Sequence, residues 1–320
     1  MTTEKISKKL LEAEKLAIFT HINPDCDAFG SMCALAEGLR QLEKKVDIFV
    51  DGKLNPYEAE IFEKTKVCKN DPDPSKYDAF VAVDCAEKGR LGKYGDVFIA
   101  HENTITIDHH FQRDEYSASS YIDPESASCA ELVYEILTKM KVEFDPTIAT
   151  YIYAGIATDT NSFINTNTTA TSYRIAEKMF SKGADTIKIN KQCFRTVSKE
   201  SNELMKLFYR KMKFVGGKFA YVILTEKDFQ KTNTSHLETA NFSNLLCSID
   251  GVKIGCCVTQ RNGKFSLSIR STFDVSAEEF AHTLNGGGHP QAAGATIDEG
   301  VRTVERILVK KARKFLRIRK

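Results

Sequence analysis

His21-Ile-Asn-Pro-Asp25-Cys-Asp27-Ala-Phe-Gly30-Ser31 is the segment from which the architecture of this chain can be inferred. It follows residues 16–20, a short apolar run whose length and composition predict a buried strand. It leads into residues 28–42, where apolar side chains recur at helical spacing. The segment is therefore a tight loop at the carboxyl end of a strand, the edge at which open α/β sheets bind ligands. Three side chains that could ligate a metal lie within seven residues of this loop: His21, Asp25 and Asp27.

The chemistry of these three residues favours a divalent cation, because imidazole and carboxylate groups are common metal ligands. Gly30 would let a backbone or a phosphate approach closely, and a helix start favours anions. The simpler alternative is that Asp27 caps the helix that begins at Ala28. A cap needs one acid and no histidine, so this alternative does not explain the whole set.

Further polar residues follow the next buried strands. Residues 46–50 form a second predicted strand, residues 80–84 a third that ends in Asp84, and residues 104–108 a fourth that ends in Asp108-His109-His110. The alternation of strands and helices predicts an α/β fold, with a mostly parallel sheet flanked by helices on both faces.

A buried carboxylate or imidazole costs several kcal/mol unless it is paired or bound to a metal. Taken singly, Asp84 or His109 could be a turn, a cap or a core hydrogen bond. Their accumulation at three strand ends favours one shared site. Asp159, near the end of an apolar helix that starts at Pro146, is a fifth acid of the same kind.

The composition of the 320 residues is that of a globular protein with two domains, 42% hydrophobic and 28% charged. The nine cysteines, an odd number without a Cys-x-x-Cys pair, argue against a disulfide framework or a zinc ribbon and predict a reducing cytoplasm. No apolar run approaches the roughly 18–20 residues of a membrane span, and the N-terminus lacks a signal-peptide core. We expect the basic tail, residues 310–320, to be the solvated side of a last helix, with contact to a polyanion as the alternative.

The second half of the chain has a different pattern. A connecting helix is predicted over about 185–208, followed by hairpins around Gly216-Gly217 and Asn262-Gly263. The glycine run before His289 predicts a concave loop that could cradle a phosphate, and a flexible loop is the alternative. Arg270 and Ser271 could contact the same phosphate, although an arginine there could equally form a surface ion pair.

Taken together, the chain resembles the DHH phosphoesterase superfamily with a DHHA1 C-terminal domain. The resemblance lies in His21-x3-Asp25-x-Asp27-Ala-x-Gly30-Ser31, Val83-Asp84-x5-Arg90-Leu-Gly92, Asp108-His109-His110, Thr158-Asp159-Thr160 and Gly286-Gly-Gly-His289-Pro-x-Ala-Ala-Gly294. It implies a DHH catalytic domain over residues 1–185, a connecting helix over 186–208, and a smaller α/β DHHA1 domain over 209–320, across a cleft.

Within this superfamily the chain looks most similar to the nanoRNase and pAp-phosphatase branch. That resemblance implies hydrolysis of short oligoribonucleotides (nanoRNA, pApA-type dinucleotides) or of 3′-phosphoadenosine 5′-phosphate, with cyclic di-AMP as an alternative substrate. Residues 111–120 are less typical of the branch, which leaves the substrate open. The exonuclease polarity is open too, as is the existence of a homodimer.

The resemblance also implies two Mn²⁺ ions, or Mg²⁺, and in-line attack of hydroxide on the phosphate. Carboxylates and imidazoles without thiolates suit these metals better than zinc. We expect the metal ligands to be His21, Asp25, Asp27, Asp84, His109 and Asp159, with Asp84 bridging both ions. Asp108 would orient His109 or complete the loop. His110 would face the scissile phosphate, as a donor to its oxygen or as an acid for the leaving group. The substrate's terminal phosphate would be held by Arg270, Ser271, Gly286, Gly287, Gly288 and His289.

Other functions fit less well. A pyrophosphatase or exopolyphosphatase of the same superfamily typically carries a different C-terminal domain, and a RecJ-type exonuclease would need additional domains. A catalytically silent nucleotide-binding or RNA-binding protein is the alternative from another class, but all six expected ligands are present. A dinucleotide-binding dehydrogenase is disfavoured because no Gly-x-Gly-x-x-Gly follows a strand.

Overall fold

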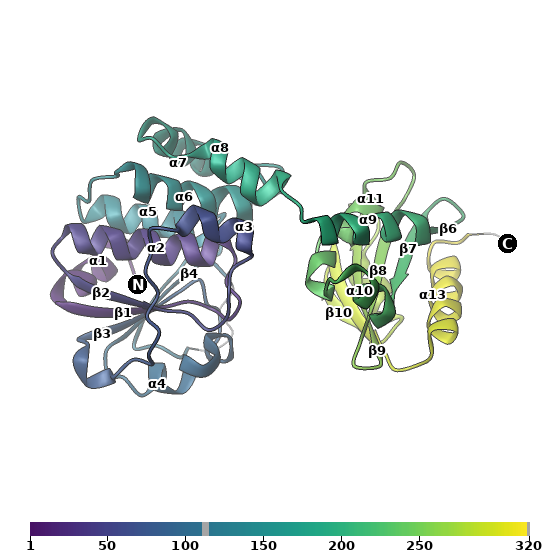
Figure 1. The fold of residues 1–320 in the computed structure, drawn as a ribbon, viewed down its shortest axis with the longest axis horizontal. Helices are drawn as coiled ribbons and strands as arrows, with labels where there is room; N and C mark the ends of the chain where they lie inside the picture. The colour runs from purple at the N-terminus through teal and green to yellow at the C-terminus, as the bar shows by residue number, and fades with distance from the viewer. Residues whose placement is uncertain (111–114, 319–320) are drawn as a thin grey trace. The chain divides into compact units, whose positions relative to one another are not determined.

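The chain folds into two compact units, Met1–Thr196 and Val197–Lys320 (Figure 1). The computed structural model describes residues 1–110 and 115–318, so part of the less typical segment 111–120 lies outside the described residues. Both units have an α/β architecture, which confirms the predicted fold class.

The first unit is built on a five-stranded parallel sheet in the order β2-β1-β3-β4-β5. Four strands lie where the sequence predicts them, whereas β5 was not predicted. It is short, and only alternate residues of it are buried, which makes its pattern weak. The strands are β1 (Lys15–Phe19), β2 (Lys45–Phe49), β3 (Ala79–Val83), β4 (Thr104–Asp108) and β5 (Ser119–Ile122).

Helices cover both faces of this sheet (Figure 1). Successive strand residues point to opposite faces, so Ile18 packs in one core cluster and Phe19 in another. Burial on both faces explains why the strands are continuously apolar rather than alternating. The longer helices are α1 (Thr3–Glu12), α2 (Cys26–Gln41), α5 (Cys129–Lys139), α6 (Pro146–Asp159) and α7 (Ala170–Ser181); the shorter ones are α3 (Pro56–Ala59), η1 (Glu60–Phe62), η2 (Pro74–Lys76), η3 (Lys88–Tyr94) and α4 (Gly95–Ile99).

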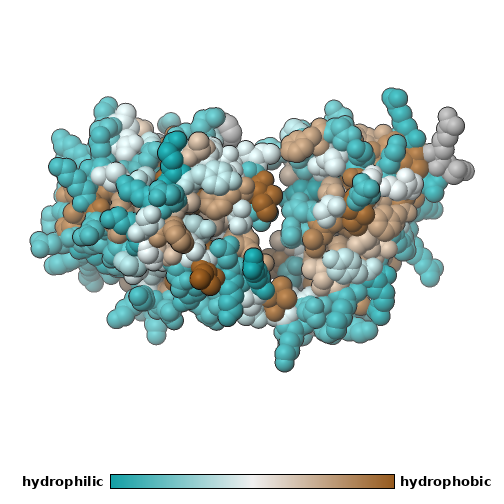
Figure 2. Space-filling model, turned by 90° about the horizontal axis from the view of Figure 1, so that it is seen from above, coloured by the Kyte–Doolittle hydropathy of each residue, from teal (hydrophilic) through white to brown (hydrophobic). Residues whose placement is uncertain are grey.

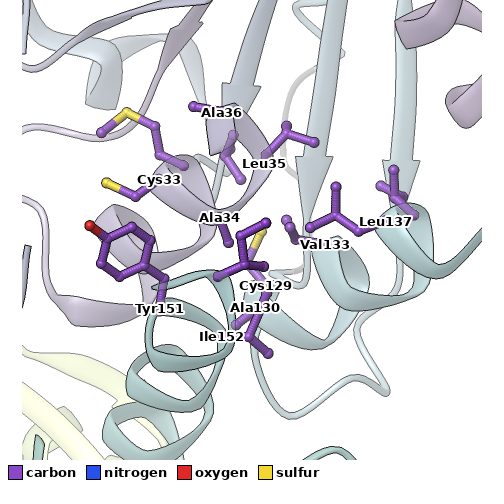
Figure 3. Close-up of a cluster of buried hydrophobic side chains, with 14 of the residues drawn as sticks. Cys33, Ala34, Leu35, Ala36, Cys129, Ala130, Val133, Leu137, Tyr151 and Ile152 are labelled. Carbon is purple, nitrogen blue, oxygen red and sulfur yellow. The ribbon is translucent and has the colours of Figure 1, made fainter. Parts of the chain in front are cut away.

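Helices α2, α5 and α6 pack very closely, as Figure 3 shows for Ala34, Ala130 and Ile152. A Cβ on Gly30 would lie 2.7 Å from the carbonyl oxygen of Tyr151 in α6. Gly30 is therefore needed for contact between two helices. Of the two predicted uses of Gly30, the structure shows the close approach of a backbone.

The connection between the units is not the single helix expected over 186–208. It consists of α8 (Thr186–Ile189), a π-helical turn (Asn190–Arg195) and α9 (Lys199–Lys211). The chain is extended at Thr196, and the Ser198 hydroxyl accepts the backbone N–H of Ser201 to start a new helix. This cap explains the interruption, and α9 belongs to the second unit.

The second unit contains a six-stranded mixed sheet in the order β10-β11-β9-β8-β7-β6. Only β7 and β8 pair in parallel among its neighbouring strands. Its strands are β6 (Lys213–Val215), β7 (Phe219–Leu224), β8 (Ile254–Arg261), β9 (Lys264–Ser271), β10 (Gly287–His289) and β11 (Ala292–Ile297). Its helices after α9 are α10 (Glu226–Thr232), η5 (His236–Thr239), α11 (Phe242–Cys247), α12 (Ala277–His282) and α13 (Val301–Phe315).

The glycine run of the second unit is a strand, not the concave loop that the sequence suggested. Gly287–His289 pairs antiparallel with β11 as β10. A Cβ on Gly286 would collide with the carbonyl oxygen of Gly294, and one on Gly288, whose φ is 149°, would lie 2.6 Å from that of Ala292. These two glycines allow the strands to come together.

On the face seen in Figure 2, both units carry many hydrophilic side chains, with apolar side chains scattered among them. Isolated apolar side chains on a surface are ordinary in globular proteins. Among the described residues, every helix is too short or too polar to cross a bilayer.

Candidate metal centre

Seven of the predicted site residues come together at the carboxyl edge of the first sheet. They follow β1, β3 and β4, begin α2 and end α6, and they form three overlapping groups of potential ligand atoms, each lying within 4.8 Å of one another. The groups are His21, Asp25 and Asp84; Asp84, His109 and His110; and Asp27, His109 and Asp159.

Asp84 lies between two of these groups. Its Oδ2 is 3.7 Å from Nε2 of His21, and its Oδ1 is 3.5 Å from Nε2 of His109. The Nε2 atom of His109 is also 3.3 Å from Asp159 and 3.8 Å from Asp27. Nε2 of His21 is 4.0 Å from Asp25. The two oxygens of Asp84 thus face two separate sets of donors.

The two imidazoles are held so that Nε2 faces the carboxylates. Nδ1 of His21 lies 2.9 Å from the carbonyl oxygen of Ile22, and Nδ1 of His109 lies 3.2 Å from that of Ser126. Since a carbonyl only accepts hydrogen bonds, each Nδ1 carries the proton and donates. Each ring thereby turns its Nε2 toward the carboxylate oxygens, the orientation in which it could ligate a cation between them.

Asp27 is buried at the N-terminus of α5. Its carboxylate accepts the backbone N–H groups of Cys129 at 2.7 Å and Ala130 at 3.0 Å. Burial, followed by the nearby charges of Asp84 and Asp159, raises its pKa well above the usual range. The reading of Asp27 as the helix cap is wrong: Asp25 caps α2, since its Oδ1 accepts the N–H groups of Asp27 and Ala28.

Asp84 has an unusual backbone and an unpaired oxygen. Its φ is 55°, in the left-handed region that a non-glycine residue rarely adopts. Its Oδ1 is buried without a hydrogen-bond partner in the described structure. Burial alone would raise its pKa, but contacts with His110, His109 and His21 outweigh burial and lower it. Strain of this kind is retained mainly at functional sites.

The charge of the cluster is not balanced by basic side chains. Within residues 1–110 and 115–318, the ion pairs of Asp25, Asp27, Asp84 and Asp159 are all with histidines. Burial, together with Asp84 and Asp25, raises the pKa of Asp159 to about 7, although His109 opposes this rise. Four crowded carboxylates with a buried, unpaired oxygen fit a site for divalent cations.

Asp108 contacts His110 rather than His109. Its Oδ1 accepts the backbone N–H of His110 at 3.1 Å and lies 2.9 Å from the ring Nδ1. The expected orientation of His109 by Asp108 is therefore not observed, because the Ser126 carbonyl performs that role. The hydrogen bond to Asp108, followed by the close contact with Asp84, raises the pKa of His110 to about 10. The imidazole of His110 is accordingly protonated at neutral pH and half-exposed.

The segment just before and within the first turn of α5 supports three of these residues, and the sequence arguments had missed it. Its backbone N–H groups bind Asp27, and its Ser126 carbonyl oxygen lies beside His109. The side chain of Asn167 donates to the carbonyl oxygens of Ala127 and Asp159 at 3.0 and 3.3 Å. The buried carboxylate of Glu131 accepts Ser126 Oγ at 3.1 Å and the N–H of Ala127 at 3.3 Å. The Ser-x-x-Glu pattern over 128–131 is a capping-box signal that could have revealed this support.

The predicted phosphate-binding residues of the second unit do not all have free polar groups. His289, Ala292 and Arg270 share one row across three neighbouring strands. Their side chains therefore lie on one face, and His289 and Arg270 are about 10 Å apart at the usual strand spacing. Ser271 instead donates its hydroxyl proton to the carbonyl oxygen of Val275 at 2.7 Å and accepts the N–H of Ala277.

Comparisons with known proteins agree with this architecture. The chain is 29% identical over 286 residues to the bifunctional oligoribonuclease and PAP phosphatase NrnA of Thermus thermophilus, covering 88% of this chain and 83% of that protein. It is 24% identical over 287 residues to the protein of the same name in Bacillus subtilis, covering 89% and 90%.

Among solved structures, an exopolyphosphatase-related protein from Bacteroides fragilis superimposes with a TM-score of 0.86 over 98% of this chain and 97% of that one. At 23% identity, this likeness shows a common fold alone. Residues 15–156 match the N-terminal domain of the DHH family, and residues 216–317 match the DHHA1 domain. The chain therefore belongs to the DHH family and carries a DHHA1 domain as its second unit.

Proposed function

We propose that this chain is a metal-dependent phosphoesterase that hydrolyses short oligoribonucleotides and 3′-phosphoadenosine 5′-phosphate. The observation that carries the proposal is the convergence of four carboxylates and two histidine Nε2 atoms on one sheet edge. The names of the two NrnA relatives supply the substrate class.

We assign the donors to two cations that share Asp84. His21 and Asp25 would hold one cation, and Asp27, His109 and Asp159 the other. The nearby thiols face elsewhere: Cys26 contacts Cys193, and Cys129 donates to the Ile107 carbonyl. A set of oxygen and imidazole donors without thiolates favours Mn²⁺ or Mg²⁺. When bound, such ions lower the pKa of an attacking water and neutralise charge that develops on the phosphate.

His110 is assigned to the phosphate itself. Asp108 and Asp84 engage its Nδ1, so the N–H at Nε2 is the group available to a substrate. The hydrogen bond to Asp108 favours the protonated ring and raises the pKa of His110 in the metal-free chain to about 10. His110 would then act as a cationic hydrogen-bond donor that positions the phosphate and stabilises its charge.

In the second unit, Arg270 and His289 would bind the terminal phosphate of the substrate. Their shared row places both side chains on one face, with only the methyl group of Ala292 between them. A guanidinium binds phosphate through two parallel hydrogen bonds. Ser271 and the glycines Gly286, Gly287 and Gly288 contribute indirectly, by holding the hairpin that presents His289.

The test is a substrate panel with the purified full chain and Mn²⁺. Initial rates would be compared for pAp, pApA, a short RNA, cyclic di-AMP and pyrophosphate, with Asp84→Asn as the control for contaminating hydrolases. We expect pAp or the short RNAs to react fastest. A chain saturated with Mn²⁺ that prefers pyrophosphate or cyclic di-AMP, or that hydrolyses none of these, would contradict the proposal.

A further inference from the structure

Two cysteines that are distant in the sequence meet beside the metal centre. Sγ of Cys26 lies 3.7 Å from Sγ of Cys193, although 167 residues separate them. The adjacent pair Cys256 and Cys257 is different: these side chains point to opposite faces of β8 and belong to separate core clusters. All nine cysteines are free thiols.

The two thiols differ in their exposure and in their place in the fold. Cys26 is the first residue of α2, is 1% exposed, and sits in the chain between Asp25 and Asp27. Cys193 lies in the π-helical turn that ends the first unit and is only partly buried. An oxidant can therefore reach Cys193 but not Cys26. Isolated π-helical turns recur at functional positions in proteins.

We propose that Cys26 and Cys193 form a reversible disulfide that weakens metal binding at the neighbouring centre. The effect on metal rests on the proposed function, whereas the cross-link itself rests only on the contact between the two sulfurs. The proposed site is a modification site for peroxides, with reduction by a small thiol as the reverse reaction.

The oxidation proceeds in two balanced steps. Cys193 attacks one peroxide oxygen, the O–O bond breaks, and a sulfenic acid and one water form. The sulfur of Cys26 then attacks the sulfenic sulfur, and the S–O bond breaks as the S–S bond forms. The proton of Cys26 leaves with the departing hydroxide as a second water. Two thiols thus supply the two electrons that reduce one hydrogen peroxide to two waters.

The cross-link would disturb the metal ligands because of where Cys26 lies. An S–S bond is about 2 Å long, so the sulfurs must move closer than their present 3.7 Å. The first turn of α2 also carries Asp25, which caps the helix through one oxygen and faces His21 with the other. Ligands must be held to within about 0.5 Å, and disturbing the groups that support them typically costs 10–100-fold in metal affinity.

The experiment uses the full chain, stripped of metal and treated with hydrogen peroxide or with dithiothreitol. Peroxide is removed before Mn²⁺ is added, and binding is measured by titration calorimetry. We expect a peptide map under non-reducing conditions to show Cys26 joined to Cys193, and Mn²⁺ binding to weaken about 10–100-fold. Dithiothreitol should restore both.

Two variants complete the design. Cys193→Ser should keep its Mn²⁺ affinity after peroxide, whereas Cys68→Ser, which removes another partly buried thiol, should respond like the unaltered chain. Absence of the cross-linked peptide, an unchanged Mn²⁺ affinity in the cross-linked chain, or an equal loss in Cys193→Ser would each overturn the inference. Normal Mn²⁺ binding without any hydrolysis would overturn the proposed function instead.

Discussion

The two units of this chain carry opposite charge. Residues 1–196 contain 24 lysines and arginines against 31 aspartates and glutamates, whereas residues 197–320 contain 21 against 12. The formal charge of +2 for the whole chain conceals this division. The acidic unit has buried carboxylates clustered where metal cations could bind, whereas the basic unit has exposed lysine and arginine side chains.

The basic surface is clearest on α13. Its apolar residues Val304, Leu308 and Ala312 are fully buried, and its one acid, Glu305, pairs with Lys213 and accepts the hydroxyl of Tyr221. The exposed side of the helix then carries basic side chains at helical spacing: Arg302, Arg306, Lys310 and Lys314. The comparison teaches that a near-neutral chain can still have one half suited to metals and the other to phosphates.

Asp84→Asn should show the largest effect, because it removes the shared carboxylate of the acidic unit. We expect kcat/KM for pApA to fall by about 1000-fold or more, since metal assistance is worth several kcal/mol. The same change should lower the stability of the metal-free chain somewhat, because contacts with His110, His109 and His21 favour the ionised carboxylate in the fold. Kinetics and thermal unfolding check both. Retained activity in a folded variant would refute the shared role of Asp84.

The stability of the metal-free chain should fall as the pH rises from about 4 to about 10. The pKa of Asp159 is raised to about 7 and that of Asp27 is raised well above its ordinary value, so the folded state keeps protons that the unfolded state releases. His110, with a pKa raised to about 10, loses its stabilising charge over the upper part of this range. Saturating Mn²⁺ should raise the unfolding temperature of the first unit and flatten this dependence. Calorimetry at several pH values measures the unfolding temperature. If added Mn²⁺ left that temperature unchanged, the result would contradict a metal site.

Arg270→Ala tests whether the basic unit binds the terminal phosphate of the substrate. Losing a charged hydrogen bond to phosphate, worth about 1.5–3 kcal/mol, should raise KM for 5′-phosphorylated dinucleotides about 10–100-fold with a smaller change in kcat. His289→Ala should act in the same direction. Mn²⁺ affinity should not change in either variant. An unaltered KM would show that this face does not hold the phosphate.

Asn167→Ala should have a smaller effect, confined to the acidic unit. It removes the amide that joins the carbonyls of Ala127 and Asp159, and we expect Mn²⁺ affinity to fall about 10-fold. Asn165→Ala is the matched control, because Asn165 donates to Asp159 alone. If the two variants lose affinity equally, the link to Ala127 has no role in positioning the ligands.

The smallest effect is expected from α13. Replacing Arg302, Arg306 and Lys310 with alanine should weaken binding of a single-stranded RNA a few-fold at low salt and reduce the salt dependence of that binding. Hydrolysis of pAp should not change, because this nucleotide is too small to extend along the exposed side of α13. Fluorescence anisotropy over a salt series measures how RNA affinity depends on salt. The same salt dependence in the variant and the unaltered chain would show that these basic side chains contact only solvent.

Much of the fold and the metal centre could be predicted from the sequence. The strands of the first unit are buried on both faces, so they are strongly apolar, and each polar residue at a strand end is conspicuous. Contacts set by tertiary geometry were less predictable. Whether Asp25 or Asp27 caps α2, and whether Asp108 holds His109 or His110, depends on backbone angles that composition does not encode. The glycines near His289 resembled a loop because close pairing of strands and flexibility both require a residue without a Cβ.

The six proposed metal ligands are spread from position 21 to position 159, and this spread has a consequence for biosynthesis. A nascent chain that has emerged from the ribosome only as far as β4 holds several acids of the cluster but lacks Asp159, which ends α6. Its carboxylates would repel one another without the complete set of donors around a cation. Binding by the complete set of donors would therefore require synthesis to pass Asp159, at about the middle of the 320 residues, and could precede synthesis of the second unit.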